Sequence, residues 1–402
     1  MSVRLAMTAL ALGGFGIGTT EFVAMGLLPQ IADGMGVSEP AAGHVISAYA
    51  LGVVVGAPAI SALTARVDRR RLLVAHMAAF TVGNAVTVLA PSMNVLIASR
   101  FLAGLPHGAY FGVASLVAAR LAGAGRRAKA VATVMLGLSV ANVLGVPLAA
   151  AMGQQLGWRS AFGLVAVIGL ATMAALLRWV PSMAAAPSSS PRAELGALRR
   201  PQVWLTLAVG MVGFGGMFAV YTYIATTLTD VAGLSSALVP LALALYGLGM
   251  VAGNLVGGRL ADRALMPSMF AMLALIAAVM GLFVVAAHNP VTALAAVFLV
   301  GASGAAMVPA LQTRLMDVAA DAQNLAAALN HSALNVANAG GAWLGGVVIA
   351  AGLGYTAPAA VGAGLAVAGL LILTVSAAAQ RRTDAGKVQA DADRDDAPVT
   401  VH

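Results

Sequence analysis

The chain consists of long apolar runs separated by short polar connections. Each run has about 20 residues or more, the length that an α-helix needs to cross the hydrocarbon core of a bilayer. The runs lie at 5–29, 43–65, 72–91, 96–119, 129–151, 160–180, 203–227, 236–259, 266–287, 290–313, 323–352 and 356–379. They are apolar on both faces, whereas a strand of a membrane barrel alternates apolar with polar side chains. The pattern therefore predicts an all-α membrane protein with twelve transmembrane helices.

The basic residues fall almost entirely into alternate connections. Even-numbered connections and the chain ends carry 20 of the 22 lysines and arginines, namely Arg4, Arg66, Arg69, Arg70, Arg71, Arg120, Arg126, Arg127, Lys129, Arg178, Arg192, Arg199, Arg200, Arg259, Arg263, Arg314, Arg381, Arg382, Lys387 and Arg394. The exceptions are Arg159, in an odd-numbered connection, and Arg100, near the start of the fourth run. Because positive charge accumulates in cytoplasmic loops, this distribution predicts that both termini face the cytoplasm.

An internal repeat divides the chain into two halves. The segment AYALGVVVG at 48–56 matches LYGLGMVAG at 245–253 at an offset of 197. Two more short matches support the repeat. FLAG at 101–104 matches FLVG at 298–301 at an offset of 197, and VAN at 140–142 matches VAN at 336–338 at an offset of 196. Parallel repeats of this kind are typical of transporters in which one bundle rocks against the other.

The domain boundaries follow from this repeat and from local composition. The connection at 181–202 is rich in Ala, Ser and Pro, as a flexible linker is, and the last residues are polar with mixed charge. We expect an N-terminal six-helix bundle at 1–180, a cytoplasmic linker at 181–202, a C-terminal six-helix bundle at 203–380 and a disordered cytoplasmic tail at 381–402.

Composition excludes several other classes of protein. The chain is 60% apolar and 9% charged, against roughly 25% charged residues in a soluble domain. It has no cysteine and therefore no disulfide or thiolate chemistry. The net charge of +8 follows membrane topology, so we expect no nucleic-acid partner. The sequence has neither metal-ligand spacing nor a phosphate-binding loop, and we expect no metal, no cofactor and no enzymatic activity.

Several motifs resemble the major facilitator superfamily. The segments 65–71 and 258–263 are similar to its loop motif GxxxDRxGRR, although Thr64 and Arg70 stand where that motif has glycine. RFLAG at 100–104 resembles the basic motif of its proton-coupled members, and GLSVANVLGVP at 137–147 resembles its antiporter motif. GTTEFVAMGLLP at 18–29 and GLPHGAYFGV at 104–113 are similar to AraJ-type sugar efflux permeases and related chloramphenicol efflux proteins. The resemblance implies the twelve-span fold and proton-coupled efflux of a sugar or drug.

Glu21 is an acidic residue inside an apolar run. An ionised carboxylate at a helix centre costs roughly 2.5–3.5 kcal/mol on insertion scales, so it usually faces a cavity or a partner. Gly14, Gly18 and Met25 share its helical stripe, and the small residues on that face leave room for a substrate or for close helix approach. We interpret Glu21 as the group that binds the transported proton or the substrate, as the resemblance also implies. A structural ion pair with Arg100, or a hydrogen bond to a neighbouring helix, is the alternative.

The fourth run contributes further candidates. Arg100 keeps its proton and would orient a substrate or act on Glu21 through its charge; the alternative is that its side chain snorkels to the membrane edge. His107 would relay protons or contact the substrate, or serve as a hydrogen-bonded structural residue. Tyr110 and Phe111 would stack on a sugar ring or drug, or pack within the protein.

A polar stripe on the eleventh run predicts a lining for the substrate cavity. His331, Asn335 and Asn338 form it, and such groups are costly in a membrane helix unless they meet water, a ligand or another helix. Hydrogen bonding between helices is the alternative. The remaining candidates for substrate contact are Met25, Tyr49, Asn142, Tyr221, Tyr223 and Asn254.

Charged residues at the cytoplasmic ends of two runs are candidates for gating. Asp68 and Asp262 would pair with arginines or helix termini across the interface between the bundles and latch one conformation. Ordinary solvated loop charges are the alternative. The predicted gating residues are Asp68, Arg69, Asp262, Arg263, Gly145 and Pro147.

Together these features predict a secondary transporter of the bacterial inner membrane. We expect a proton-coupled antiporter that exports a small solute, a sugar or a drug, by alternating access. Its partners would be the substrate, protons and membrane lipid, and a monomer would suffice because one chain contains both halves. A proton-independent facilitator or importer on the same fold is the alternative, and a non-transporting membrane sensor is a more distant one.

Overall fold

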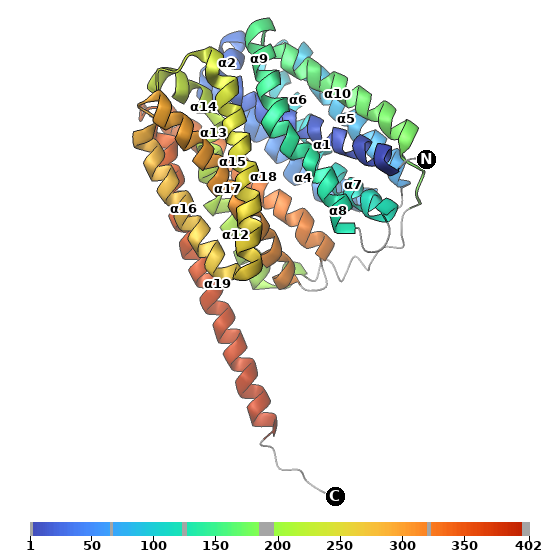
Figure 1. The fold of residues 1–402 in the computed structure, drawn as a ribbon, viewed down its shortest axis with the longest axis vertical. Coiled ribbons are helices and arrows are strands. Elements are labelled where there is room, and N and C mark those ends of the chain that lie inside the picture. Colours follow the sequence, from blue (N-terminus) through green and yellow to red (C-terminus); the bar gives the residue numbers. More distant parts are fainter. Residues whose placement is uncertain (1–2, 65–66, 123–126, 185–196, 320–322, 396–402) are drawn as a thin grey trace, which may run out of the picture.

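A computed structural model describes residues 3–64, 67–122, 127–184, 197–319 and 323–395. Within these residues the regular secondary structure is helical, without a strand. Twelve helical segments among them are long and apolar enough to cross a membrane, which confirms the number of spans predicted from the apolar runs. Two bundles of helices make up the molecule (Figure 1).

The N-terminal half contains the first six spans. Its helices are α1 (Val3–Gly26), α2 (Leu28–Met35), α3 (Glu39–Ala42), α4 (His44–Leu63), α5 (Arg69–Leu89), α6 (Met93–Gly104), α7 (His107–Ala122), α8 (Arg127–Val140), η1 (Ala141–Gly145), α9 (Val146–Leu156) and α10 (Trp158–Trp179). The short helix α2 lies in the connection between the first two spans, and α3 begins the second span. The fourth span is α6 with α7, and the fifth is α8, η1 and α9.

The C-terminal half repeats this arrangement. Its helices are η2 (Ala197–Arg199), α12 (Pro201–Gly213), α13 (Gly215–Thr222), α14 (Ile224–Thr226), η3 (Thr227–Val231), η4 (Ser236–Leu238), α15 (Val239–Arg263), α16 (Leu265–Ala286), α17 (Pro290–Ala319), α18 (Gln323–Ala350) and α19 (Ala357–Asp395). The seventh span combines α12 and α13, and the other five spans of this half are built on α15 to α19.

Proline interrupts two spans that the sequence presents as continuous runs. The fourth span breaks between α6 and α7 at Pro106, which has no N–H to donate to the helix. The fifth span contains a wide turn of π-helix, Ala141–Gly145, directly before Pro147. The missing N–H of Pro147 leaves a helix carbonyl without its donor, and a wide turn of this kind accommodates such a defect.

Glycine packing is repeated between the halves. A side chain at Gly52 in α4 would meet the Phe101 carbonyl of α6, and one at Gly249 in α15 would meet the Phe298 carbonyl of α17. Both pairs are related by the offset of the sequence repeat. The absence of a side chain lets each pair of helix backbones approach closely. The duplication seen in the sequence is therefore present in the packing.

The halves meet through a continuous apolar cluster at one end of the molecule. This cluster runs from the C-terminal part of α1 and the start of α4 into α13, α15 and α17. The other end of the N-terminal half has an apolar cluster of its own, formed by α1, α5, α7 and α10. We call the shared region, around residues 22–47 and 218–243, the closed end.

Hydrogen bonds also join the halves at the closed end. The Ser47 hydroxyl of α4 donates to the Ala339 carbonyl of α18 at 3.0 Å. The Thr226 hydroxyl, at the end of α14, donates to the Glu39 carboxylate at the start of α3. These contacts fix the first part of the second span onto the C-terminal half.

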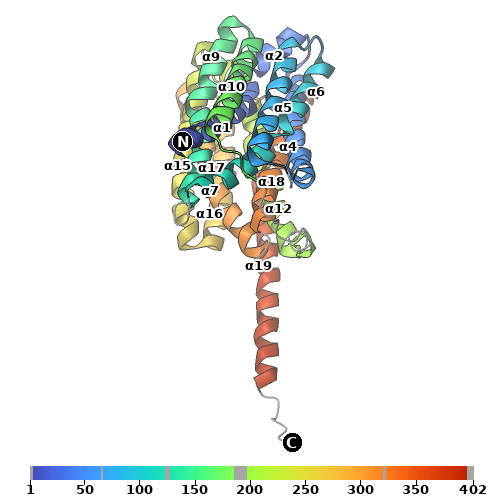
Figure 2. The same cartoon turned by 90° about the vertical axis from the view of Figure 1, so that its right-hand side faces the viewer.

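The last helix differs from the predicted tail. The sequence predicts disorder from residue 381, whereas α19 runs from Ala357 to Asp395 and projects from the bundle as a long rod (Figures 1 and 2). Residues 381–395 contain no proline and several good helix formers, so the apolar helix continues into the polar segment. Residues 396–402, and 185–196 of the predicted linker, lie outside the described residues.

Candidate functional site

The Glu21 carboxylate lies between the two halves and has no bonded partner among the residues that the structure describes. The residue is 8% exposed, and among the described residues its oxygens make neither a hydrogen bond nor an ion pair. The carboxylate oxygens are not fully buried, because the fully buried polar atoms without a partner do not include them. They therefore retain accessible surface. Arg100 and Tyr49 of the N-terminal half and Tyr246 of the C-terminal half lie within electrostatic range. This placement agrees with a carboxylate that faces a space between the halves.

Arg100 is completely buried, which shows that it does not snorkel to the membrane edge. Its Nη1 donates to the Thr20 hydroxyl at 2.9 Å, and its Nη2 donates to the Thr20 carbonyl at 2.8 Å. The guanidinium carbon lies 4.5 Å from the centre of the Tyr49 ring and 5.0 Å from that of Phe162. Hydrogen bonds and aromatic faces therefore hold this charge, rather than an ion pair with Glu21.

Two polar residues behind Arg100 were not among the predicted site residues. The Thr20 hydroxyl donates to Asn84 Oδ1 at 2.6 Å, and Asn84 Nδ2 donates to the Phe80 carbonyl at 2.8 Å. Asn84 is fully buried on α5. An amide inside the third apolar run is a signal that the sequence does carry, but its contact with Thr20 depends on the packing of α1 against the other helices.

The predicted residues of the fourth and eleventh spans meet across the halves. The Tyr49 hydroxyl lies 3.0 Å from His107 Nδ1, and the His107 and Phe111 ring centres are 5.4 Å apart. The Phe111 ring of α7 is parallel to that of His331 on α18, at 6.2 Å and within 3°. His331 is half-buried. A line of aromatic and imidazole rings therefore connects α4 with α18.

Buried amide groups near the interface are incompletely bonded. Asn142 Nδ2 donates to the Leu138 carbonyl and Asn335 Nδ2 to the His331 carbonyl, each at 3.0 Å. Within the described structure, Oδ1 of both residues and both amide atoms of Asn338 are buried without a partner. Each such group costs about 1–3 kcal/mol. These amides are suited to bind a polar ligand, or a helix in another arrangement of the halves.

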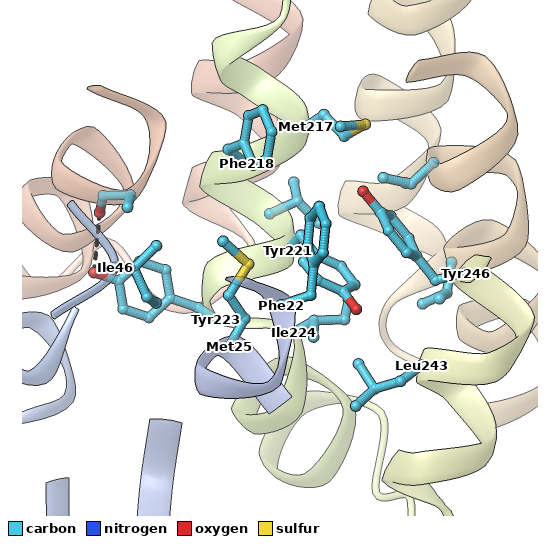
Figure 3. Packing of buried hydrophobic residues seen from close by; sticks show 14 of the residues in the cluster. Phe22, Met25, Ile46, Met217, Phe218, Tyr221, Tyr223, Ile224, Leu243 and Tyr246 are labelled. Carbon is cyan, nitrogen blue, oxygen red and sulfur yellow. Dashed lines mark hydrogen bonds between the residues drawn. The ribbon is translucent and has the colours of Figure 1, made fainter. Parts of the chain in front are cut away.

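An aromatic layer closes the interface beside Glu21. The Phe22 ring of α1 meets the Tyr221 ring edge-on at 5.8 Å, and Tyr221 stacks on Tyr246 at 3.9 Å. Met25 is fully buried in the same layer, where Figure 3 shows side chains of α1, α13 and α15 packed together. Met25 and Tyr221, predicted to contact substrate, thus lie in the closed end in this structure.

Tyr223 belongs to the same closed end. Its hydroxyl donates to the Ala342 carbonyl at 3.1 Å (Figure 3). A side chain at Gly43 or Gly346 would meet this hydroxyl, so the ring is wedged between the start of α4 and α18.

Tyr110 and Asn254, which were predicted to contact substrate, lie apart from the residues around Glu21 and the closed end. The Tyr110 hydroxyl donates to the Leu10 carbonyl at 2.9 Å, and its ring occupies the space that a side chain at Gly13 would take. This geometry favours the packing alternative for Tyr110. Asn254 is half-buried on α15, about two helical turns beyond Tyr246.

In this structure the gating candidates Asp68 and Arg69 make their contacts within the N-terminal half and the start of the linker. Asp68 caps α5: its Oδ1 accepts the Arg71 N–H at 3.0 Å, and its Oδ2 accepts the Ser182 hydroxyl at 2.7 Å. The Arg69 N–H donates to the Met183 carbonyl at 2.9 Å. All these partners precede the C-terminal bundle, so Asp68 stabilises the N-terminal half and does not latch it to the other half in this structure.

The other gating candidates occupy two different environments. Asp262 and Arg263 are exposed at the end of α15. Gly145, one residue before the helix that contains Pro147, abuts the Thr19 hydroxyl and the Phe15 ring of α1. The same wide turn touches the C-terminal half, because a side chain at Gly247 would meet the Asn142 carbonyl.

Two repeated six-span halves, with a buried carboxylate between them, define the fold of a secondary transporter. Among the described residues, no group of three or more metal-binding side chains comes together. The Major Facilitator Superfamily profile matches residues 10–324 and 227–398. The chain belongs to the Major Facilitator Superfamily, and it is a membrane transport protein and not an enzyme.

Similar proteins support this assignment. The inner membrane transport protein YdhP of Escherichia coli is 42% identical over 383 residues, 95% of this chain and 98% of YdhP. The transporter AraJ of E. coli and a chloramphenicol resistance protein of Streptomyces lividans are each 36% identical over 356 residues, 88% of this chain and 90% of theirs. The fold matches that of a D-xylose–proton symporter with a TM-score of 0.74 and 17% identity, covering 93% and 97% of the two chains. The chain is therefore a multi-pass protein of the bacterial inner membrane.

Proposed function

We propose that this protein is a proton-coupled antiporter that exports a small solute by alternating access. The observation that carries the proposal is the Glu21 carboxylate, which lies between the halves with accessible surface and no bonded partner among the described residues. A carboxyl group in this position can exchange a proton with the space between the halves. Arg100 of α6, which its hydrogen bonds to Thr20 hold in place, supplies a fixed positive charge nearby.

The exported solute is a neutral or amphipathic compound of the sugar or phenicol type. Similar proteins are named for chloramphenicol resistance and for sugar efflux. Amide groups of Asn142, Asn335 and Asn338 can bond hydroxyl or amide groups of such a compound, and the rings of Phe111 and His331 offer flat faces.

The orientation predicted by the basic residues places the closed end at the periplasmic face. The structure then corresponds to a state closed toward the periplasm. Protonation of Glu21 from the periplasm would displace the solute, and release of the proton to the cytoplasm would restore the site. The proton gradient supplies the energy, no cofactor takes part, and a monomer contains the complete path.

Replacement of Glu21 by glutamine tests the proton coupling. In proteoliposomes with radiolabelled chloramphenicol or L-arabinose, we expect Glu21→Gln to lose movement driven by a pH gradient and to retain downhill exchange. The amide keeps the size of the side chain but cannot release a proton. Asp317→Asn, the same change at an exposed position of α17, is the control and should transport as the wild type does.

Undiminished pH-driven transport in Glu21→Gln would overturn the proton role of Glu21. Transport by the wild type that persists after a protonophore collapses the gradient would show a facilitator instead. If the wild type moves neither compound, the proposed solute class is wrong.

A further inference from the structure

Arg100 makes its hydrogen bonds to the residue that precedes Glu21, and not to Glu21 itself. Both terminal nitrogens of the guanidinium bond Thr20, one through the hydroxyl and one through the carbonyl. Tyr49 and Phe162 cover the guanidinium with their rings. Hydrogen bonds to Thr20 of α1, next to Glu21 in the sequence, thus hold the Arg100 guanidinium in place. The Glu21 carboxylate has no bonded partner in the described structure.

Asn84 fixes the direction of the hydrogen bonds that hold Arg100. Its Nδ2 donates to the Phe80 carbonyl of its own helix, so its Oδ1 faces Thr20. The Thr20 hydroxyl therefore donates its single hydrogen bond to Asn84 Oδ1 and accepts one from Arg100 Nη1. The network runs in one direction, from Arg100 through Thr20 and Asn84 to the α5 backbone.

We propose that Thr20 and Asn84 are positioning residues that keep the Arg100 guanidinium from pairing with Glu21. The inference rests on the proposed function, because it assigns how the proton-binding carboxylate is kept free. A carboxylate in direct contact with a guanidinium holds its charge more firmly and takes up a proton only at lower pH. An arginine held on Thr20 acts on Glu21 across space and leaves the carboxylate able to exchange its proton.

The other titratable groups near Glu21 come from four packed helices. Tyr49 of α4 and Tyr246 of α15 lie within electrostatic range of the carboxylate. His107 of α7 bonds Tyr49 and interacts electrostatically with His331 of α18. Every variant in the test leaves these four residues in place, so a change in proton uptake reports the position of Arg100.

The proposal predicts a shift in the protonation of Glu21 that needs no substrate to measure. Infrared difference spectra of the purified protein, recorded across pH, contain a carboxylic C=O signal that is absent from Glu21→Gln and so belongs to Glu21. In Thr20→Val, Arg100 loses an acceptor and can turn to the carboxylate. We expect the midpoint of this signal to move toward acid by about 1 pH unit, with a smaller shift in the same direction for Asn84→Leu.

Two control variants separate positioning from a general structural effect. Thr20→Ser keeps the hydroxyl and should restore the wild-type midpoint. Thr19→Val makes the same change one residue earlier, where the hydroxyl bonds the Phe15 carbonyl of its own helix at 2.8 Å, and should leave the midpoint unchanged.

The possible outcomes distinguish this proposal from the proposed function. An unchanged midpoint in both Thr20→Val and Asn84→Leu, or an equal shift in Thr19→Val, would overturn the positioning role. If Thr20→Val does not yield folded protein, Asn84→Leu with the Thr20→Ser control decides the question alone. If the wild type shows no titrating signal that Glu21→Gln removes, the proton-exchanging role of Glu21 itself fails.

Discussion

At the scale of single residues, Arg100 and Glu21 show two different ways of placing a charge inside a membrane protein. Arg100 has no exposed surface and is stabilised by charge-assisted hydrogen bonds and by two aromatic faces. Glu21 keeps accessible surface and no bonded partner in the described structure. An unpaired buried charge is costly, so this difference supports the proposed role of Glu21 in transport.

Asp68 contributes to the stability of the folded protein in a way that depends on pH. Slight burial raises the pKa of its carboxyl, but hydrogen bonds from Ser182 and from backbone N–H groups, that of Arg71 among them, outweigh this, and the pKa lies below its ordinary value. The folded protein therefore binds this proton less readily than the unfolded chain, and the resulting stability is present above about pH 3.9 and lost as the pH falls further.

We expect Asp68→Ala to lower the stability of the folded protein at neutral pH. Loss of a helix N-cap costs about 0.5–2 kcal/mol, and the thermal unfolding temperature in detergent measures it. Asp68→Asn, which keeps an acceptor at the N-cap, should lie closer to the wild type. The difference between wild type and Asp68→Ala should shrink under acid; a difference that grows with acidification would contradict the assignment.

At the scale of helices, the two halves are built on the same close backbone contacts. The glycines at 52 and 249 let α4 approach α6 and α15 approach α17. Periodicity in the sequence located these helices, and the repeat placed their glycines in equivalent positions. The breaks within spans were harder to predict, because a proline such as Pro147 marks a defect without fixing whether the helix bends, ends or widens.

Glycine-to-alanine substitutions should have opposite effects at two helical positions. A Cβ at Gly52 would meet the Phe101 carbonyl, whereas one at Gly258 of α15 would meet nothing within 4 Å. Overpacking costs about 1–3 kcal/mol, while alanine gains up to about 1 kcal/mol in helix propensity over glycine. We expect Gly52→Ala to lower the unfolding temperature and Gly258→Ala to hold or raise it. Equal effects would contradict the close contact at Gly52.

At the scale of the whole molecule, contacts at the closed end hold the two halves together on one face of the transporter. Apolar packing there is continuous between the halves, and the Thr226 hydroxyl bonds the Glu39 carboxylate across them. In the proposed alternating-access cycle, this interface must open once in every turnover. Its hydrogen bonds therefore change the equilibrium between the state in which the closed end is shut and the state in which it is open.

Removal of the Thr226 hydroxyl should make the closed end open more often. A hydrogen bond worth about 1 kcal/mol changes the open population about fivefold. The wild-type chain has no cysteine, so a single Leu243→Cys in the closed layer can report opening by its rate of maleimide labelling. We expect faster labelling with Thr226→Val. Thr229→Val is the control and should not change the rate, because the Thr229 hydroxyl bonds only groups of the C-terminal half in the described structure: the Ala225 and Thr226 carbonyls and the Asp230 carboxylate.

The sequence by itself determined the number of spans, the two repeated halves, the membrane location and the family, because burial in lipid imposes long apolar runs and duplication leaves a constant offset. It also singled out Glu21 and Arg100, because charge is conspicuous in an apolar run. Only the tertiary structure decided that Arg100 bonds Thr20, that Asn84 orders this network, and that Tyr221 and Met25 lie in the closed end. These contacts join residues far apart in the chain, and they depend on how helices pack rather than on any local pattern.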